Sequence, residues 1–454
     1  MNADDLARWT RRRTAPRRTV RLPAARYAYP VAVGASGAAW YAADSLRHRR
    51  EQGSGYELGA DAPPVGDRAF LRTTEALTGA PISVGNDIEL LINGDAIFPA
   101  FLETIRGAKK TLNLLTYVYW RGDITHEIAD ALCEKAREGV EVNVLLDWVG
   151  TLKMDGSLVE RLREAGATVA KFRPLKPYAV RRLDNRTHRK LLIADGEVGM
   201  TGGVGIADEW TGNAQDPDHW RDTHVRVRGP VVRGLQGAFI ENWLEATGTV
   251  LVGDDHLPDL DDDNIDEDDE SVAAMQVVRS RAGVGDTNIE ALMFLAIASA
   301  REHLDLTAAY FAPRPAFTTA LCEAAARGVR VRVLVPGAKG DKQIVRMAGR
   351  ESYDDLLDCG VEVYEYCPTM LHAKSLVIDG AWSSVGSVNF DNRSFQLQDE
   401  ATLCVQDPGF AAKLTEQYER DLEQSEPIAP GRWAQRGLRE RAAERALTLI
   451  RREL

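Results

Sequence analysis

His188-Arg-Lys190-Leu-Leu-Ile-Ala-Asp195 and His372-Ala-Lys374-Ser-Leu-Val-Ile-Asp379 are two copies of one pattern. Each copy reads His-x-Lys, four further residues and Asp, and after six more residues comes a patch of small residues, Gly202-Gly203 or Gly386-Ser387. Side chains alternate along a strand, so the His and the Lys of each copy are expected on one face. A phosphodiester lying there would meet an imidazole and an ammonium together. We call the two segments the cassettes.

The residues after each lysine predict a β-hairpin. Apolar residues continue the strand, and Asp195-Gly196 and Asp379-Gly380 are turn signals. The returning strands are expected at Val198 to Thr201 and at Trp382 to Val385. Turn chemistry alone explains an Asp before a Gly, so structural roles are expected for Asp195 and Asp379.

A longer internal repeat surrounds the cassettes. Residues 131–145 (ALCEKAREGVEVNVL) reappear as residues 320–334 (ALCEAAARGVRVRVL). In both, a helix is expected to end at a glycine, Gly139 or Gly328, before an alternating strand. A further strand is predicted ahead of each helix, at 112–119 and 304–311. Each half therefore reads strand, helix, strand, helix and hairpin, which is an α/β layer over a largely buried sheet.

The cassettes resemble the paired HKD motifs of the phospholipase D superfamily, and their surroundings are similar to the bacterial cardiolipin synthases within it. The resemblance extends from Val84 to Trp433 and implies two pseudo-symmetric phospholipase D-like repeats. Each repeat would be a mixed β-sheet flanked by helices, an αβαβα sandwich. Besides the cassettes, the matching stretches are Gly203 to Glu209, Trp220 to His224, Tyr310-Phe311, Leu371 to Lys374 and Asn392 to Phe395.

The resemblance also implies how the cassettes react. One histidine attacks phosphorus to form a phosphohistidine, while the other protonates the leaving alcohol and then deprotonates the incoming one. Superfamily analogy makes His188 the nucleophile and His372 the acid/base, although the residues alone leave the order open. Lys190 and Lys374 would stabilise the phosphoryl oxygens as charge develops there.

Other positions are expected to support this chemistry. Asp222 and Glu400 match the family's downstream acidic residues and would orient the two imidazoles. Ser387, Asn389 and Gly203 are predicted to bind substrate. No metal or cofactor is expected. Structural roles are expected for His126, His219, His224 and His256.

The first cassette departs from the family pattern. Gly203 stands where the second cassette has Ser387, and Gly205 stands where it has Asn389. The first half-site is therefore expected to lack a hydrogen-bond donor. Gln398 also stands where relatives commonly carry Asn. These departures bear on the identity of the substrate more than on the type of reaction.

The net charge of −12 is unevenly distributed. Residues 1–50 carry a net +8 and residues 431–454 a net +4, which leaves −24 on the intervening body. An acidic body disfavours a nucleic-acid partner, which would want a basic stripe along its path. Basic ends favour attachment to an anionic membrane surface.

The uncharged run 27–43 follows eight arginines. Its 17 residues would form a helix of about 26 Å, marginal for crossing a bilayer, so an interfacial segment is favoured over a transmembrane helix. We predict a membrane-bound protein, peripheral or N-terminally anchored, with a cytoplasmic catalytic body. Five cysteines without a CxxC pair indicate no disulfide framework, and buried thiols are expected for Cys322, Cys359, Cys367 and Cys404.

The expected organisation has five parts. Residues 1–80 form a basic N-terminal region whose stretch 45–80 reads as a linker, 81–253 the first repeat, 254–270 an acidic linker and 271–430 the second repeat. Residues 431–454 form a basic amphipathic helix that lies either on a membrane or on the body.

The sequence is compatible with four functions. The favoured reading is a phosphatidyltransferase similar to cardiolipin synthase, converting two phosphatidylglycerols to cardiolipin and glycerol. A phospholipase D would use the same residues with water as the acceptor. An HKD nuclease is the alternative from another substrate class, and a lipid-binding scaffold becomes attractive only if Gly205 has disabled the first half-site.

Overall fold

A computed structural model of the chain describes residues 56–174, 185–260, 272–282, 286–341, 346–347, 349–430 and 433. The predicted segment 27–43, residues 261–270 of the acidic linker and all but Trp433 of the predicted C-terminal helix lie outside these ranges. In the described part of the chain, no helix combines the length and the apolar character needed to cross a membrane. Residues from Tyr56 onward belong to one compact unit, and the description below concerns that unit.

The first repeat is a mixed sheet whose strands are arranged in the order β1-β8-β7-β6-β2-β3-β4. Strands β2, β3 and β4 run parallel to one another, and β6 is antiparallel to β2. Its elements are β1 (Asp87–Ile92), α4 (Asn93–Gly107), β2 (Thr111–Thr116), α5 (Asp123–Arg137), β3 (Glu141–Asp147), α6 (Gly156–Glu164), β4 (Thr168–Phe172), β5 (Arg186–Thr187), β6 (Leu191–Ala194), β7 (Val198–Gly202), η2 (Asp208–Trp210), β8 (Thr223–Arg228) and α7 (Val232–Thr247).

The second repeat has the same strand order. The path β9-β15-β14-β13-β10-β11-β12 follows that of the first sheet strand for strand, and β16 adds an edge. Its elements are β9 (Ala274–Ser280), α8 (Asn288–Ser299), β10 (His303–Ala308), α9 (Pro315–Ala326), β11 (Arg330–Pro336), η3 (Arg350–Ser352), α11 (Tyr353–Asp358), β12 (Glu362–Tyr366), β13 (Lys374–Ile378), β14 (Trp382–Gly386), η4 (Arg393–Leu397), β15 (Gln398–Gln406), α12 (Pro408–Leu422) and β16 (Ser425–Pro427). The predicted pair of pseudo-symmetric repeats is confirmed.

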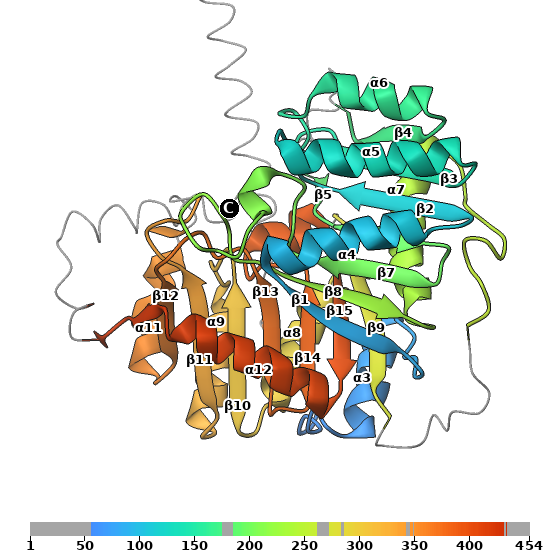
Figure 1. Cartoon of the computed structure of the whole chain (residues 1–454). Helices are drawn as coiled ribbons and strands as arrows, with labels where there is room; N and C mark the ends of the chain where they lie inside the picture. Colours follow the sequence, from blue (N-terminus) through green and yellow to red (C-terminus); the bar gives the residue numbers. More distant parts are fainter. Residues whose placement is uncertain are drawn as a thin grey trace, which may run out of the picture. The chain divides into compact units, whose positions relative to one another are not determined.

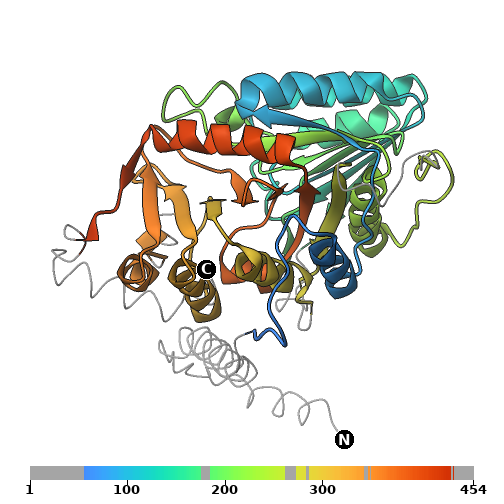
Figure 2. The ribbon, with the colours of Figure 1, turned by 90° about the horizontal axis from the view of Figure 1, so that it is seen from below.

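Helices cover both faces of the second sheet. Seen from below, α12 (red) lies on one side of the orange strands, while the golden-brown helices and the blue α3 (Arg68–Thr78) lie on the other (Figure 2). In Figure 1, α12 runs across the second sheet, and α4, α5 and α6 stack over the strands of the first. Each sheet is thus buried on both faces, which explains its continuous apolar runs such as Leu191 to Ala194.

The two sheets pack against each other through a shared apolar layer. Leu115, Leu191 and Val225 of the first repeat meet Val377 and Leu403 of the second in one buried cluster. Alternate residues of the same strands, such as Leu192, face outward into the first repeat's own core. Period-two alternation therefore assigns one face of each sheet to one set of its own helices and the other face to the shared layer, which also includes residues of α7 and α12.

The hairpins form as predicted, while two features of the halves were missed. The returning strands β7 and β14 match the predicted ranges with one added glycine each. The strands predicted at 112–119 and 304–311 end earlier, at Thr116 and Ala308. Each sheet also holds a strand after its second helix, β4 or β12, which the sequence analysis did not separate from the loop before the cassette.

The linker predicted at 45–80 is wrong for its described part. Residues 68–78 form helix α3, and Phe70 packs fully buried, edge-on to Trp382 of the second repeat. Ala62 and Val65 join the same core. The charges and glycines of this stretch suggested solvent exposure, but its few apolar residues lie on one helical face.

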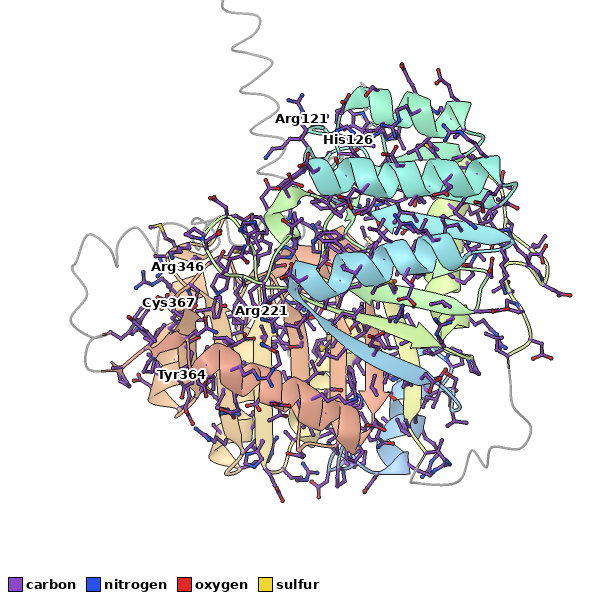
Figure 3. All side chains as sticks on the ribbon, viewed as in Figure 1. Arg121, His126, Arg221, Arg346, Tyr364 and Cys367 are labelled. Atoms are coloured by element: carbon purple, nitrogen blue, oxygen red, sulfur yellow. A yellow bond between two sulfur atoms is a disulfide. The ribbon has the colours of Figure 1, made fainter. Side chains whose placement is uncertain are left out.

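The prediction of four buried thiols is also corrected. Cys322 of α9 and Cys359, directly after α11, form a disulfide across 37 residues of chain. Cys367, labelled in Figure 3, is exposed, and only Cys404 is a buried thiol as predicted. Cysteine spacing alone could not show that two helices would bring Cys322 and Cys359 together. The prediction that the cysteines form no disulfide framework is therefore wrong for this pair.

The aspartates that end the cassettes bind backbone, in equivalent ways in the two repeats. The Asp379 carboxylate accepts hydrogen bonds from the N–H groups of Arg301, Glu302 and His303 at 2.8–2.9 Å. Asp195 does the same with residues 109–111. Both residues adopt positive φ angles, 56° at Asp195 and 52° at Asp379. They fix each hairpin turn to the start of the neighbouring strand, which supports the expected structural role.

We expect Asp379→Ala to lower the free energy of unfolding by about 2 kcal/mol, because three backbone donors lose a charged acceptor and the left-handed backbone loses a residue that tolerates it. Asp379→Asn, which keeps an acceptor oxygen and tolerates positive φ, is the matched variant and should lose less than half as much. Urea denaturation measures both. Equal losses in the two variants would contradict this role.

Candidate active site

The histidines that begin the two cassettes, His188 and His372, lie where the two repeats touch. The backbone N–H of His188 donates to the carbonyl of Asp399 in the second repeat at 2.9 Å. The backbone N–H of His372 donates to the carbonyl of Arg221 in the first repeat at 2.7 Å. Each contact belongs to a short parallel pairing, β5 with β15 and residue 221 with residue 371. The backbone that precedes each lysine is therefore placed by the opposite repeat.

The orienting carboxylates are exchanged in the same way. His188 Nδ1 lies 3.1 Å from Glu400 Oε1, and Glu400 belongs to β15 of the second repeat. His372 Nδ1 lies 2.8 Å from Oδ2 of Asp222, which directly precedes β8 of the first. All four side chains are at least 94% buried. Neither repeat contains both members of either of these two pairs.

These contacts assign the ring proton of His188. Its Nδ1 lies 3.0 Å from the carbonyl oxygen of Ser387, which can only accept a hydrogen bond. Nδ1 must therefore carry a proton, and in the neutral ring Nε2 keeps its lone pair. A histidine in this tautomer can attack through Nε2 while Glu400 balances the charge that develops on the ring.

His372 lies next to an ammonium as well as a carboxylate. The Lys374 Nζ lies 2.9 Å from Nδ1 and 3.1 Å from Nε2 of the ring, and it also contacts the backbone carbonyl of His372. Lys190 Nζ donates to the backbone carbonyl of His188 at 2.7 Å. Each lysine thus contacts its own histidine, Lys190 through the backbone carbonyl and Lys374 through the ring as well.

Burial and neighbouring charges shift the pKa values of His372, Asp222 and Glu400 in different directions. Burial, together with Lys374 and Lys190, lowers the pKa of His372 to about 3. Burial raises the pKa of Asp222, but His372 and Lys374 outweigh it and the pKa is lowered. His372 is therefore neutral beside an ionised carboxylate. Burial raises the pKa of Glu400 to about 7, although Lys190 and Lys374 oppose the shift. Since both lysines act on both sides, the two cassettes share one electrostatic centre.

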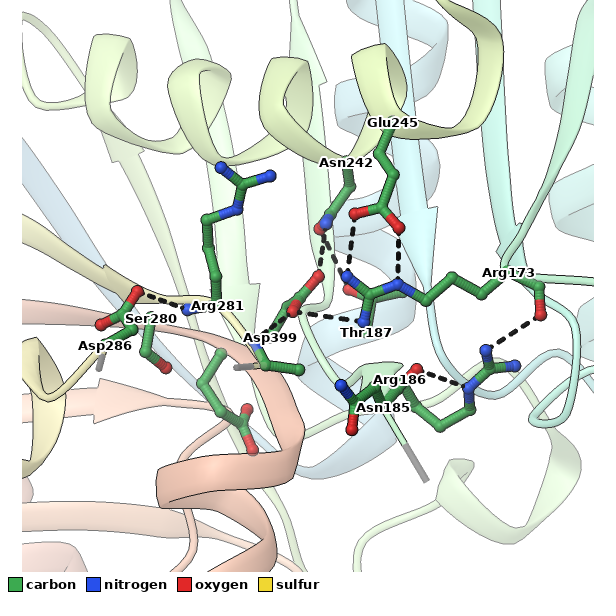
Figure 4. Close-up of polar contacts among 12 residues, drawn as sticks. Arg173, Asn185, Arg186, Thr187, Asn242, Glu245, Ser280, Arg281, Asp286 and Asp399 are labelled. Carbon is green, nitrogen blue, oxygen red and sulfur yellow. Dashed lines mark hydrogen bonds and ion pairs between the residues drawn. The ribbon is translucent and has the colours of Figure 1, made fainter. Parts of the chain in front are cut away.

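A buried polar network anchors β5, which directly precedes His188 (Figure 4). The Asn242 amide of α7 donates to Asp399 at 2.6 Å and accepts from the Thr187 hydroxyl at 3.1 Å. Arg173 pairs with Glu245 and lies 3.6 Å from Asp399. The network joins α7 and β4 of the first repeat to β15 of the second.

Two buried arginines complete the anchoring. Arg189, between His188 and Lys190, points to the opposite face and donates to the carbonyls of Glu400, Ala238 and Ser280. Arg221, labelled in Figure 3, binds both carboxylate oxygens of Asp421 at the end of α12. Both arginines donate hydrogen bonds from the first repeat to the second, and neither was expected from the sequence. The alternation of the cassette already placed Arg189 opposite the reactive pair.

Two of the predicted substrate-binding residues, Ser387 and Gly203, lie against the carboxylates Glu400 and Asp222, and the third, Asn389, lies against the backbone of Tyr310. The Ser387 hydroxyl donates to Glu400, and Asn389 Oδ1 accepts from the backbone N–H of Tyr310 at 3.3 Å. A Cβ built on Gly203 would lie 2.1 Å from Asp222 Oδ1. Their part in substrate binding stays a prediction.

The histidines for which structural roles were expected belong to neither the His188–Glu400 nor the His372–Asp222 pair. His126 is exposed on α5, His219 pairs with Asp216, and His256 lies 3.4 Å from Glu141. His224 is fully buried beside Phe101. Over the described ranges, three or more His, Cys, Asp or Glu side chains nowhere cluster in a way that could hold a metal ion.

Comparison with known proteins identifies relatives over most of the chain. A family described as "Cardiolipin synthase, PLD-like domain" matches residues 101–216 and 293–422. The chain is 34% identical to cardiolipin synthase 2 of Bacillus anthracis over 84% of its length and 73% of the relative. It is 35% identical to cardiolipin synthase of Alkalihalophilus pseudofirmus over 79% of its length and 70% of the relative. Phosphatidylserine synthase of Haemophilus influenzae has the same fold, with a TM-score of 0.64 at 15% identity, covering 85% of this chain and 99% of that one.

We expect kcat/KM for phosphodiester cleavage to fall as pH decreases below about 7, since protonated Glu400 no longer balances positive charge on His188. Above that pH the carboxylate is ionised and the rate levels off. In Glu400→Gln the rate should be low and nearly flat between about pH 5 and 8, because the titrating group is gone. Asp222→Asn, also low in rate, should keep the acidic limb. A limb near pH 7 that survives in Glu400→Gln would contradict the assignment.

Proposed function

The chain belongs to the cardiolipin synthase family of proteins with phospholipase D-like domains, and from this premise we propose that it is a phosphatidyltransferase making cardiolipin from two phosphatidylglycerols. The observation that carries the proposal is the pair of His-x-Lys cassettes meeting at one centre, each histidine paired with the other repeat's carboxylate. Phospholipid is the substrate class that the relatives' names imply.

In the first step, His188 Nε2 attacks phosphorus of phosphatidylglycerol. A P–N bond forms, the P–O bond to glycerol breaks, and His372 gives a proton to the departing oxygen. His372 is neutral in the free protein, so this step needs a proton that a bound phosphodiester anion favours by raising the ring's pKa. Lys190 and Lys374 stabilise the phosphoryl oxygens.

In the second step, the hydroxyl of another phosphatidylglycerol attacks the phosphohistidine. Neutral His372 takes the hydroxyl proton while ionised Asp222 balances the resulting charge. The new P–O bond gives cardiolipin, the P–N bond breaks, and His188 is regenerated. If water takes the hydroxyl's place, the product is phosphatidic acid, and the enzyme is a phospholipase D.

Membrane attachment is part of the proposal. The substrate is a lipid, and basic residues dominate both ends of the chain, where residues 1–50 carry a net charge of +8. A peripheral or N-terminally anchored protein with its catalytic body on the cytoplasmic side fits these charges. The net −24 of the body continues to disfavour the nuclease reading, because a polyanionic backbone would be repelled.

We expect the purified protein to convert phosphatidylglycerol vesicles to cardiolipin and glycerol, as measured by mass spectrometry. His188→Ala and His372→Ala should each lower the rate at least about 10³-fold. His126→Ala, an exposed histidine on α5 that Figure 3 labels, is the matched control and should leave the rate unchanged.

The same samples locate the nucleophile. Phosphohistidine survives alkaline denaturation, so labelled phosphate should be trapped on wild type and His372→Ala and be absent from His188→Ala. Label on His188→Ala alone would reverse the two roles. Phosphatidic acid without cardiolipin would make the protein a phospholipase D, and DNA cleavage without lipid turnover would favour the nuclease.

A further inference from the structure

The two orienting carboxylates are held by different donors. Glu400 receives hydrogen bonds from the hydroxyls of Ser387 and Ser394, besides its contact with His188. The Ser394 hydroxyl also accepts from the backbone N–H of Asn389 at 3.0 Å. The second half-site thus fixes its carboxylate with two serines from one segment.

The equivalent segment of the first repeat has neither serine. Gly202 and Gly386 end equivalent strands, and Ile206 and Phe390 form equivalent bridges, to Tyr119 and Phe311. This correspondence places Gly203 at the position of Ser387, Gly205 at that of Asn389 and Trp210 at that of Ser394. The hydroxyl donors are missing, and a tryptophan stands in the second place.

Trp210 supplies a donor of its own. Its indole Nε1 donates to Asp222 Oδ2 at 2.9 Å, the same oxygen that lies 2.8 Å from His372 Nδ1. The ring is buried, with 2% exposed, and stands edge-on to His372 at 5.2 Å between centroids. The indole therefore touches both members of the Asp222–His372 pair.

The two glycines leave the room that this arrangement needs. A Cβ on Gly203 would lie 2.1 Å from Asp222 Oδ1, so any side chain there would displace the carboxylate. A Cβ on Gly205 would lie 2.8 Å from Val118 Cβ and 3.1 Å from Cη2 of Trp210. The departures from the family pattern at 203 and 205 thus accompany a tryptophan that fills the same space.

We propose that Trp210 is a positioning residue for His372, its indole N–H replacing the serine hydroxyls of the other half-site and fixing the Asp222 carboxylate. The inference rests on the proposed role of His372 as acid and base. It means that the first half-site is rebuilt around a different donor and is not disabled by Gly205. The competing explanation is that Trp210 only fills volume in the aromatic cluster with Trp120 and Trp220.

Two substitutions separate a donor from a volume filler. Trp210→His keeps a ring N–H, since Nε2 of imidazole overlies Nε1 of indole when the five-membered rings coincide, but it loses more volume. Trp210→Phe keeps more apolar volume and loses the N–H. A positioning role orders turnover as wild type, then His, then Phe, whereas a packing role places Phe above His.

Trp243 gives a matched control. It is equally buried, stacks on Phe239, and its indole N–H has no hydrogen-bond partner among the described residues. Trp243→Phe should therefore retain more activity than Trp243→His, the reverse of the order at 210. Thermal unfolding of all four variants establishes that folded protein is being compared.

The experiment uses phosphatidylglycerol and a p-nitrophenyl phosphodiester. Nitrophenolate leaves without a proton, so the burst of nitrophenolate does not require the acid, while breakdown of the phosphohistidine still requires His372 as base. We expect Trp210→Phe to lower steady-state turnover of both substrates roughly 10- to 100-fold. For the nitrophenyl substrate the burst rate and kcat/KM should stay within about threefold, because both report formation of the phosphohistidine and not its breakdown. Trp210→His should recover at least about a third of the lost turnover.

A double-mutant cycle with Asp222→Asn completes the test, because a residue acting through Asp222 adds nothing once the carboxylate is gone. Additive losses, Phe above His at position 210, or a burst reduced as much as turnover would overturn the proposal. Failure of wild type to make cardiolipin would refute the proposed function alone, since the order of the variants is still read from the nitrophenyl substrate.

Discussion

Each cassette imidazole in this protein lies against a carboxylate from the other half of the chain. His188 Nδ1 lies 3.1 Å from Glu400, and His372 Nδ1 lies 2.8 Å from Asp222. The backbone amides of both histidines are held across the same boundary. The apolar layer between the two sheets, with Leu115 and Val377 among its members, therefore has a catalytic consequence as well as a structural one. Its packing sets the distance between partners that no single repeat contains.

Burying so many charges is costly, and the surrounding network shows how the cost is met. Asp222, Glu400 and Arg189 are at most 1% exposed, and a buried charge without partners would shift its pKa or destabilise the fold. Arg189 donates hydrogen bonds to three backbone carbonyls. The two carboxylates accept hydrogen bonds from serine, tryptophan and backbone donors. The raised pKa of Glu400 marks the place where this compensation is least complete.

Local patterns in the sequence were sufficient for the hairpins, the duplicated helix and strand, and the reactive pairs, because turn chemistry and period-two alternation act over a few residues. Partners far apart in the chain were accessible only by family resemblance, as with Asp222 and Glu400, or not at all. Trp210 lies one residue beyond the stretch that carried the resemblance, and its donor role depends on space left by two glycines. The disulfide and the packing of α3 likewise depend on which surfaces meet, a property that composition does not encode.

The exchange of carboxylates also bears on the order in which the protein acquires reactivity during synthesis. The first repeat leaves the ribosome before the second, and N-terminal domains generally fold first, but its shared apolar layer is completed only by residues such as Val377 and Leu403. It then holds a histidine without its carboxylate and a carboxylate without its histidine. The His188–Glu400 pair that the proposed phosphoryl transfer requires can form only when β15 has been made and has paired with β5. The chemistry is thus the last property of the nascent chain to appear.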